Sequence, residues 1–157
     1  MLKIKLFLFK LKNLIIIIKS RFIKKKIKVK YKIIKRNFEN YIKTKNFSEK
    51  WFLNNFEVFH HYLPKNINAN FSYLEIGSYE GLSALNILFN YKNSKVTAID
   101  LWGKSNINSE SINVNFNEVE GKFNKNLEGY EYSKIKKDSV VALREILKKN
   151  IFFDIIY

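Results

Sequence analysis

The sequence predicts an α/β fold built around a parallel sheet, and three observations support this prediction. From residue 71 onward, short apolar segments alternate with segments whose apolar residues recur every three or four positions. A turn bounded by Gly77 and Gly81 joins the first apolar segment to the first helical one, and Asp100 ends the next apolar segment. Strands that alternate with helices form parallel sheets, because each return to the sheet passes through a helix.

The charge of the chain is concentrated near its N-terminus. Residues 1–50 contain 17 Lys or Arg and two acids, whereas residues 51–157 contain 12 basic and 12 acidic residues, so the net charge of +15 belongs to the first third. Basic blocks suit RNA, ribosomal surfaces or anionic membranes, because each neutralised phosphate releases counterions. The chain is also rich in Lys, Ile and Asn throughout, so a solvated extension fits equally. We divide the chain into a basic Lys/Ile-rich extension, residues 1–46, and a domain, residues 47–157.

Apolar residues within the extension bear on localisation. Lysines interrupt the apolar runs of the first 23 residues, whereas a transmembrane helix needs about 18 or more consecutive apolar residues. No small-residue cleavage site follows, which argues against a signal peptide. Peripheral membrane attachment through Phe7, Phe9, Leu11 and residues 15–18 stays open. The chain lacks cysteine, so we expect a reducing compartment, the cytoplasm or an organelle matrix, and a soluble or peripherally attached protein.

The segments before residue 71 give two further predictions. Residues 27–33 alternate with a period of two, as a half-buried strand would, although an irregular basic arm fits them equally. Ser48 can cap a helix that ends before Pro64. The helical stripe of this segment consists of Trp51, Phe52, Phe56, Phe59, Tyr62 and Leu63. We interpret the stripe as core packing rather than a stacking platform, and favour structural roles for His60 and His61.

The central stretch, residues 71–100, predicts a strand, a glycine turn, a helix and a second strand. Parallel sheets bind ligands beyond the C-terminal ends of their strands, over a glycine turn, with an acid after the second strand holding the ribose. Asp100 follows Gly81 by 19 residues, close to the roughly 20 expected for such an acid. Tyr79 stands where the dinucleotide fingerprint requires glycine, which argues against a dinucleotide-dependent oxidoreductase.

The spacing E-x-G-x-x-x-G of Glu75, Gly77 and Gly81, followed by Ser83, resembles the first motif of class I S-adenosylmethionine-dependent methyltransferases, in particular their O-methyltransferase-like branch. The resemblance covers residues 51–157 and implies a Rossmann-like methyltransferase fold with S-adenosylmethionine as cofactor. It implies that Glu75 faces the methionine ammonium, that Ser83 and the turn backbone face the carboxylate, and that Asp100 holds the ribose. The cofactor-binding residues implied in this stretch are Glu75, Gly77, Ser78, Tyr79, Gly81, Ser83 and Asp100.

Four further residues after Asp100 are cofactor candidates with open alternatives. Leu101 and Trp102 follow the acid directly, and the indole either stacks on an adenine ring or belongs to the core. Asp138 and Ser139 follow a third predicted strand, residues 132–137. By resemblance they hold the adenine amino group, but they can equally cap the next helix, residues 140–149. Between these positions the sequence predicts a polar loop, residues 104–113, and an amphipathic helix, residues 114–127, that ends near Gly129.

Residues 151–157 predict a final apolar strand. It resembles the fourth strand of the methyltransferase family, with Asp154 at the acidic position of that motif. The family sheet has seven strands in the order 3-2-1-4-5-7-6, of which this sequence supplies the first four. We therefore expect a fold truncated after the fourth strand, whose uncovered edge, residues 151–157, is paired by a partner chain or a second copy.

These patterns lead to one favoured function and one alternative. The favoured function is the cofactor-binding half of an S-adenosylmethionine-dependent methyltransferase, with a small-molecule methyl acceptor implied by resemblance. The alternative is a non-catalytic RNA- or ribosome-associated protein that acts through residues 1–46. No catalytic residue is identified, and no metal site is predicted because Asp154 is the only candidate ligand.

Overall fold

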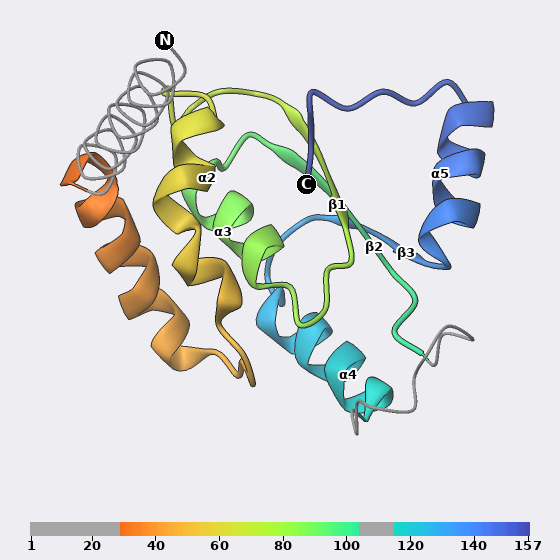
Figure 1. Ribbon diagram of the computed structural model, residues 1–157, viewed down its shortest axis with the longest axis horizontal. Helices are drawn as coiled ribbons and strands as arrows, with labels where there is room; N and C mark the ends of the chain where they lie inside the picture. Colours follow the sequence, from red (N-terminus) through yellow and green to blue (C-terminus); the bar gives the residue numbers. More distant parts are fainter. Residues whose placement is uncertain (1–28, 104–114) are drawn as a thin grey trace, which may run out of the picture.

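A computed structural model describes residues 29–103 and 115–157. Its centre is a four-stranded sheet with the strand order β3-β2-β1-β4 (Figure 1). Every neighbouring pair of strands is parallel. The structure thus confirms the predicted α/β class with a parallel sheet, and the arrangement is compatible with a Rossmann-like fold. Because all strands run in one direction, their C-terminal ends lie along the same edge of the sheet.

The strands are short and their register places the candidate residues. β1, Ser72–Ile76, pairs along its whole length with β2, Lys95–Asp100. β3, Ser133–Lys136, pairs with β2 so that Asp100 lies opposite Lys136. β4 comprises only Ile155–Ile156, which pair with the middle of β1. The predicted last strand, residues 151–157, was therefore too long, because the chain joins the sheet only from Asp154 onward.

Helices cover both faces of the sheet (Figure 1). α5, Ser139–Lys148, packs on one face through Ala142 and Ile146. The other face is covered by a larger core that includes α2, Phe56–Tyr62, α3, Leu82–Asn90, and α4, Phe116–Asn126. Successive side chains of β1 point to opposite faces of the sheet. Leu74 faces α5, whereas Tyr73 points into the larger core on the other face. Glu75, two residues after Tyr73, therefore points toward α3.

Residues 29–41 form a helix, which is neither the strand nor the irregular arm considered from sequence. Phe38 is fully buried, and Tyr31 and Ile42 are nearly so. Ile42 begins a short 3₁₀ turn, η1, Ile42–Thr44. Phe38 and Ile42 belong to the larger core, so the helix at residues 29–41 packs against the domain predicted to begin at residue 47. Residues 1–28, with the apolar runs considered for membrane attachment, and the predicted loop 104–113 lie outside the described residues.

The predicted helix between Ser48 and Pro64 is broken in two. A 3₁₀ turn, η2, covers Trp51–Asn54, and α2 starts only at Phe56. Ser48 does not cap it; the Ser48 amide donates instead to Glu80 Oε2. As a result Phe52, Phe56 and Leu63 are buried, as predicted for the stripe, but Trp51 and Tyr62 are exposed. Within the described ranges, no helix has the length and apolar character needed to cross a membrane.

Candidate functional site

The two turn glycines lie at the C-terminal end of β1 and serve different purposes. Gly77 and Gly81 both adopt left-handed backbone conformations, with φ of 81° and 83°. A Cβ atom added to Gly81 would lie 2.5 Å from Leu127 Cδ1, so this glycine permits close packing of α4. At Gly77, no described atom lies within 4 Å of such a Cβ. Gly77 therefore leaves open space above the turn, where a ligand can approach the backbone.

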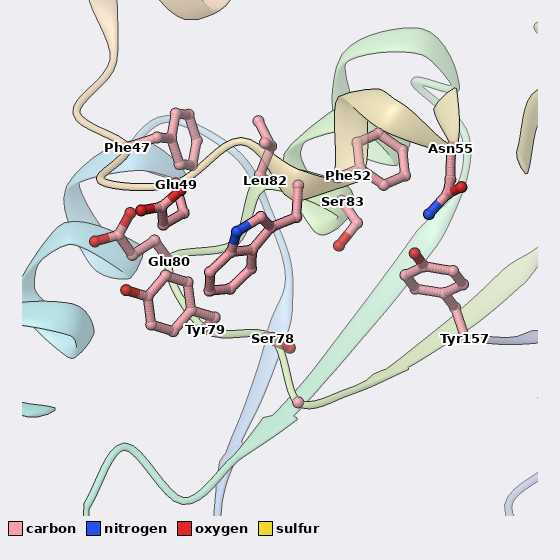
Figure 2. A pocket seen from close by; sticks show the side chains of 12 residues that line it. Phe47, Glu49, Phe52, Asn55, Ser78, Tyr79, Glu80, Leu82, Ser83 and Tyr157 are labelled. Carbon is pink, nitrogen blue, oxygen red and sulfur yellow. The ribbon is translucent and has the colours of Figure 1, made fainter. Parts of the chain in front are cut away.

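A pocket of about 230 Å³ lies over this turn (Figure 2). Residues from the segment before α2, including Phe47, Trp51 and Asn55, line it together with the turn and the start of α3. Figure 2 shows Ser78 and Ser83 between Tyr79 at one side and Tyr157 at the other. The pocket thus lies where β1 ends, over the glycine turn. The remaining lining residues are Glu49, Phe52, Gly77, Glu80 and Leu82.

Glu75 lies directly behind the pocket wall. Its side chain is 1% exposed, and Oε1 accepts hydrogen bonds from Ser83 Oγ and, at 3.4 Å, from the Tyr73 hydroxyl. Oε2 has no hydrogen-bond partner among the described residues. Burial raises the pKa of Glu75 from 4.5 to about 7, although the hydroxyls of Ser83, Ser78 and Tyr73 oppose this rise. A buried carboxylate with an unpaired oxygen is costly unless a cation or donor reaches it.

Asp100 stabilises the glycine turn through hydrogen bonds from backbone amides. Its Oδ2 accepts from the Tyr79 amide at 2.8 Å, and its Oδ1 accepts from the Trp102 amide at 2.9 Å. Tyr79, a non-glycine residue with φ of 49°, is held in this conformation partly by that bond. Each carboxylate oxygen has a second acceptor site, so Asp100 retains the capacity to accept hydroxyl groups of a ligand.

Trp102 is a core residue, which decides between the two alternatives left by the sequence. It is 2% exposed, its ring packs 4.6 Å from that of Phe123, and Lys134 Nζ lies 4.5 Å above it. Its Nε1 donates to the Tyr79 carbonyl at 2.8 Å. The indole is therefore not available to stack on an adenine ring. Instead it stabilises the glycine turn through its hydrogen bond to Tyr79. Leu101, beside it, is half-buried.

Asp138 and Ser139 occupy the start of α5, and the capping alternative is observed. Asp138 Oδ1 accepts from the amides of Val140 and Val141 at 2.9 and 3.2 Å, and Ser139 is the first helical residue. Asp154, at the acidic position of the predicted fourth strand, also lies away from the pocket. It precedes β4, and its Oδ2 accepts from the amide and hydroxyl of Ser72, both at 2.7 Å. Ser72 starts β1, so Asp154 lies where the strands begin, whereas the pocket lies where they end.

Glu80 is a structural part of the site that sequence reasoning did not identify. It is buried; its Oε2 accepts from the Ser48 amide at 2.6 Å, and Lys122 Nζ lies 3.3 Å from its Oε1. Asn126 adds to this link, since its side chain joins the Asn46 backbone and the Glu80 carbonyl. These bonds hold the segment before α2 over the glycine turn. In the sequence Glu80 is an acid between two turn glycines, a position that turns normally expose to solvent, so no local signal predicts its burial.

The two histidines lie next to each other on α2. His60 is buried, its Nε2 lies 3.0 Å from Asn86 Oδ1, and burial lowers its pKa. His61 is half-buried beside it on α2. Neither lines the pocket over the turn. Within residues 29–103 and 115–157, no group of three or more His, Asp or Glu side chains is placed to hold a metal ion.

The site can accept a small ligand that carries a positive charge at one end. Glu75 supplies a buried carboxylate behind Ser83, Gly77 supplies open backbone, and Asp100 lies at the end of the neighbouring strand. Glu80, by contrast, is already neutralised by Lys122. Compared with known proteins, the chain matches no family model and no curated protein. The class that the structure defines is thus an α/β protein with a parallel sheet compatible with a Rossmann-like fold.

Proposed function

We propose that this chain binds S-adenosylmethionine in the pocket over the glycine turn and is the cofactor-binding part of an S-adenosylmethionine-dependent methyltransferase. The observation that carries the proposal is the unpaired Oε2 of Glu75. This oxygen is buried next to the pocket wall and has no partner among the described residues. The primary ammonium group of an amino acid is the kind of donor that would satisfy it, because a charge-assisted hydrogen bond offsets the cost of burying a carboxylate.

Two further features fit the same ligand. The open space at Gly77 lets a ligand approach the turn amides and carbonyls without a Cβ in the way. Asp100 stands at the end of β2, one strand from the turn, where it can accept two neighbouring hydroxyl groups of a ribose. The ammonium partner, the open backbone and the hydroxyl acceptor therefore lie along the same edge of the sheet.

The size of the pocket indicates which end of the ligand it takes. Its volume is about 230 Å³, below the roughly 300–1,000 Å³ of pockets that enclose a drug-sized ligand. The pocket therefore suits the amino-acid end of the cofactor, while the nucleoside end would extend toward Asp100. Trp102, Asp138 and Asp154 are not assigned to this proposal, since each already has a structural role.

When bound, S-adenosylmethionine supplies an electrophilic methyl group. The residues of this chain contribute by positioning, because transfer from a sulfonium requires an acceptor in line with the methyl group rather than extensive acid-base chemistry. Glu75 would fix one end of the cofactor, Asp100 the other, and Ser83 would orient the Glu75 carboxylate through the hydrogen bond already present.

Calorimetric titration with S-adenosylhomocysteine tests the proposal. Glu75→Gln keeps the shape and removes the charge, so we expect roughly 10- to 100-fold weaker binding, the equivalent of one charged hydrogen bond of about 1.5–3 kcal/mol. Glu131→Gln makes the same change at an exposed position away from the pocket and should leave binding unchanged. Asp100 variants are less diagnostic, because Asp100 also holds the backbone of Tyr79 and Trp102. Absence of binding by the folded wild type, or equal binding by Glu75→Gln, would contradict the proposal.

A further inference from the structure

The outer face of helix 29–41 combines basic and apolar side chains. Val29 and Ile33 are 70% and 65% exposed and lie one helical turn apart, on the side of the helix that faces away from the core. Lys30, Lys32 and Arg36 are exposed around them. We call these five residues the outer helix face. Glu39 is the only acid between residues 29 and 45.

Contacts on the inner side fix the orientation of this face. Phe38 stacks on Phe56, with ring centroids 5.9 Å apart, and Tyr41 stacks on Phe89 at 4.5 Å. Lys35 Nζ pairs with Glu57 Oε1 at 3.2 Å and is therefore engaged with α2. Because the inner side is held by the core, the outer helix face is presented to solvent as a fixed surface. Figure 1 shows this helix (orange) at the edge of the molecule, across from α5.

Charge complementarity indicates the partner. The five residues of the outer helix face carry three positive charges and no negative one. The sequence that leads into the helix, residues 1–28, has ten Lys or Arg and no acid, and all but two of its other residues are Leu, Ile, Phe or Met. Basic residues mixed with large aliphatic and aromatic ones are typical of segments that bind at the interface of an anionic bilayer.

We propose that the outer helix face is a docking surface for a bilayer that contains anionic phospholipids. The basic side chains would contact the headgroup phosphates, while Val29 and Ile33 would enter the boundary between headgroups and acyl chains. Exposed aliphatic side chains distinguish this partner from RNA, since RNA-binding surfaces gain affinity from aromatic stacking and phosphate contacts rather than from Val and Ile. The proposal is independent of cofactor binding, which takes place at the edge of the sheet.

Vesicle sedimentation with the full chain tests the proposal. The probes are vesicles of phosphatidylcholine alone and vesicles of equal parts phosphatidylcholine and phosphatidylglycerol, with a single-stranded RNA at equal phosphate concentration as competitor. We expect binding to the anionic vesicles, weak binding to phosphatidylcholine, and retention on the anionic vesicles in the presence of the RNA. Full displacement by the RNA would overturn the proposal in favour of a nucleic-acid surface.

Matched variants assign the effect to this face. Each Lys or Arg near an anionic bilayer strengthens binding by roughly fivefold, so K30E/K32E/R36E should weaken it by roughly 100-fold or more. The control R144E/K148E/K149E makes the same charge change at exposed positions in α5 and directly after it and should have a much smaller effect. An equal loss in both variants would show that net charge alone acts, and would overturn the proposal.

The apolar part of the surface has its own test. V29S/I33S should weaken binding to anionic vesicles also at about 0.5 M salt, where electrostatic attraction is screened, and should leave any RNA binding unchanged. The control V140S/L147S replaces two exposed aliphatic residues of α5. Vesicle binding that is insensitive to V29S/I33S would overturn insertion of this face. Circular dichroism of each variant checks that it is folded.

Discussion

Glu75 is predicted to make the protein less stable as the pH rises through neutrality. Its carboxyl is buried, and burial raises its pKa in the folded state from 4.5 to about 7. Between these two values the folded state holds a proton that the unfolded state has released, so the stability falls with increasing pH. The full effect of raising the pKa from 4.5 to about 7 corresponds to roughly 3–4 kcal/mol, at about 1.4 kcal/mol for each unit of pKa.

Glu75→Gln removes this pH dependence. The amide keeps an oxygen that can accept from Ser83 and Tyr73, and it cannot ionise. We expect the variant to gain stability relative to the wild type as the pH rises, by roughly 2–3 kcal/mol between about pH 5 and about pH 8. Groups that titrate equally in both proteins cancel in this difference. The same substitution is expected to weaken the proposed ligand binding, so stability and the proposed function should respond in opposite directions.

Urea unfolding, followed by tryptophan fluorescence, provides the measurement. Trp102 is buried and will report the loss of the core. Glu131→Gln serves as the control, since it changes the same chemical group at an exposed position and should track the wild type at both pH values. If Glu75→Gln and the wild type differ by the same free energy at both pH values, then Glu75 is not the buried titrating group and the electrostatic reasoning for the site fails.

Three further predictions concern the site and its surroundings. Binding of S-adenosylhomocysteine should strengthen by roughly tenfold from about pH 6 to about pH 8 as Glu75 ionises with a pKa of about 7; a flat calorimetric profile would contradict the role of this carboxylate. Gly81→Ala should destabilise the fold by more than about 2 kcal/mol in urea unfolding, because backbone strain at positive φ adds to a clash with Leu127. Gly77→Ala should cost only the backbone strain, about 1–2 kcal/mol. It should nevertheless reduce ligand binding. Asp154→Asn should leave ligand binding unchanged, since Asp154 bonds Ser72 at the far edge of the sheet; loss of binding in a folded sample would contradict this placement.

The strand, glycine turn and helix at residues 72–90 were predictable because their signals are local. The apolar run, the helical period and the need for glycine at positive φ all act within a few residues. The sequence also singled out Glu75 as a candidate site residue. An acid inside an apolar strand is costly to bury unless a cation or a hydrogen-bond donor pairs with it. The capping role of Asp138 is another local interaction, over two and three residues, and was one of the two alternatives considered.

Interactions between distant parts of the chain could not be predicted in the same way. The Ser48 amide meets Glu80 across 32 positions, and Asn46 meets Asn126 across 80. These bonds hold the segment before α2 over the glycine turn. The single helix predicted between Ser48 and Pro64 is therefore interrupted. The helix at residues 29–41 likewise depends on Phe56 and Phe89, which lie far along the chain.

The sequence by itself determined that this protein has a parallel sheet with a glycine turn after its first strand, because alternation, helical period and backbone dihedrals are properties of short segments. Only the tertiary structure decided which side chains lie around the pocket over that turn. Trp102 is turned into the core by Phe123 and by the Tyr79 carbonyl, and Asp154 is placed at the far edge by the register of β4 against β1. Register and packing are set by contacts between separate segments, and no local pattern encodes which end of a strand a given residue will occupy.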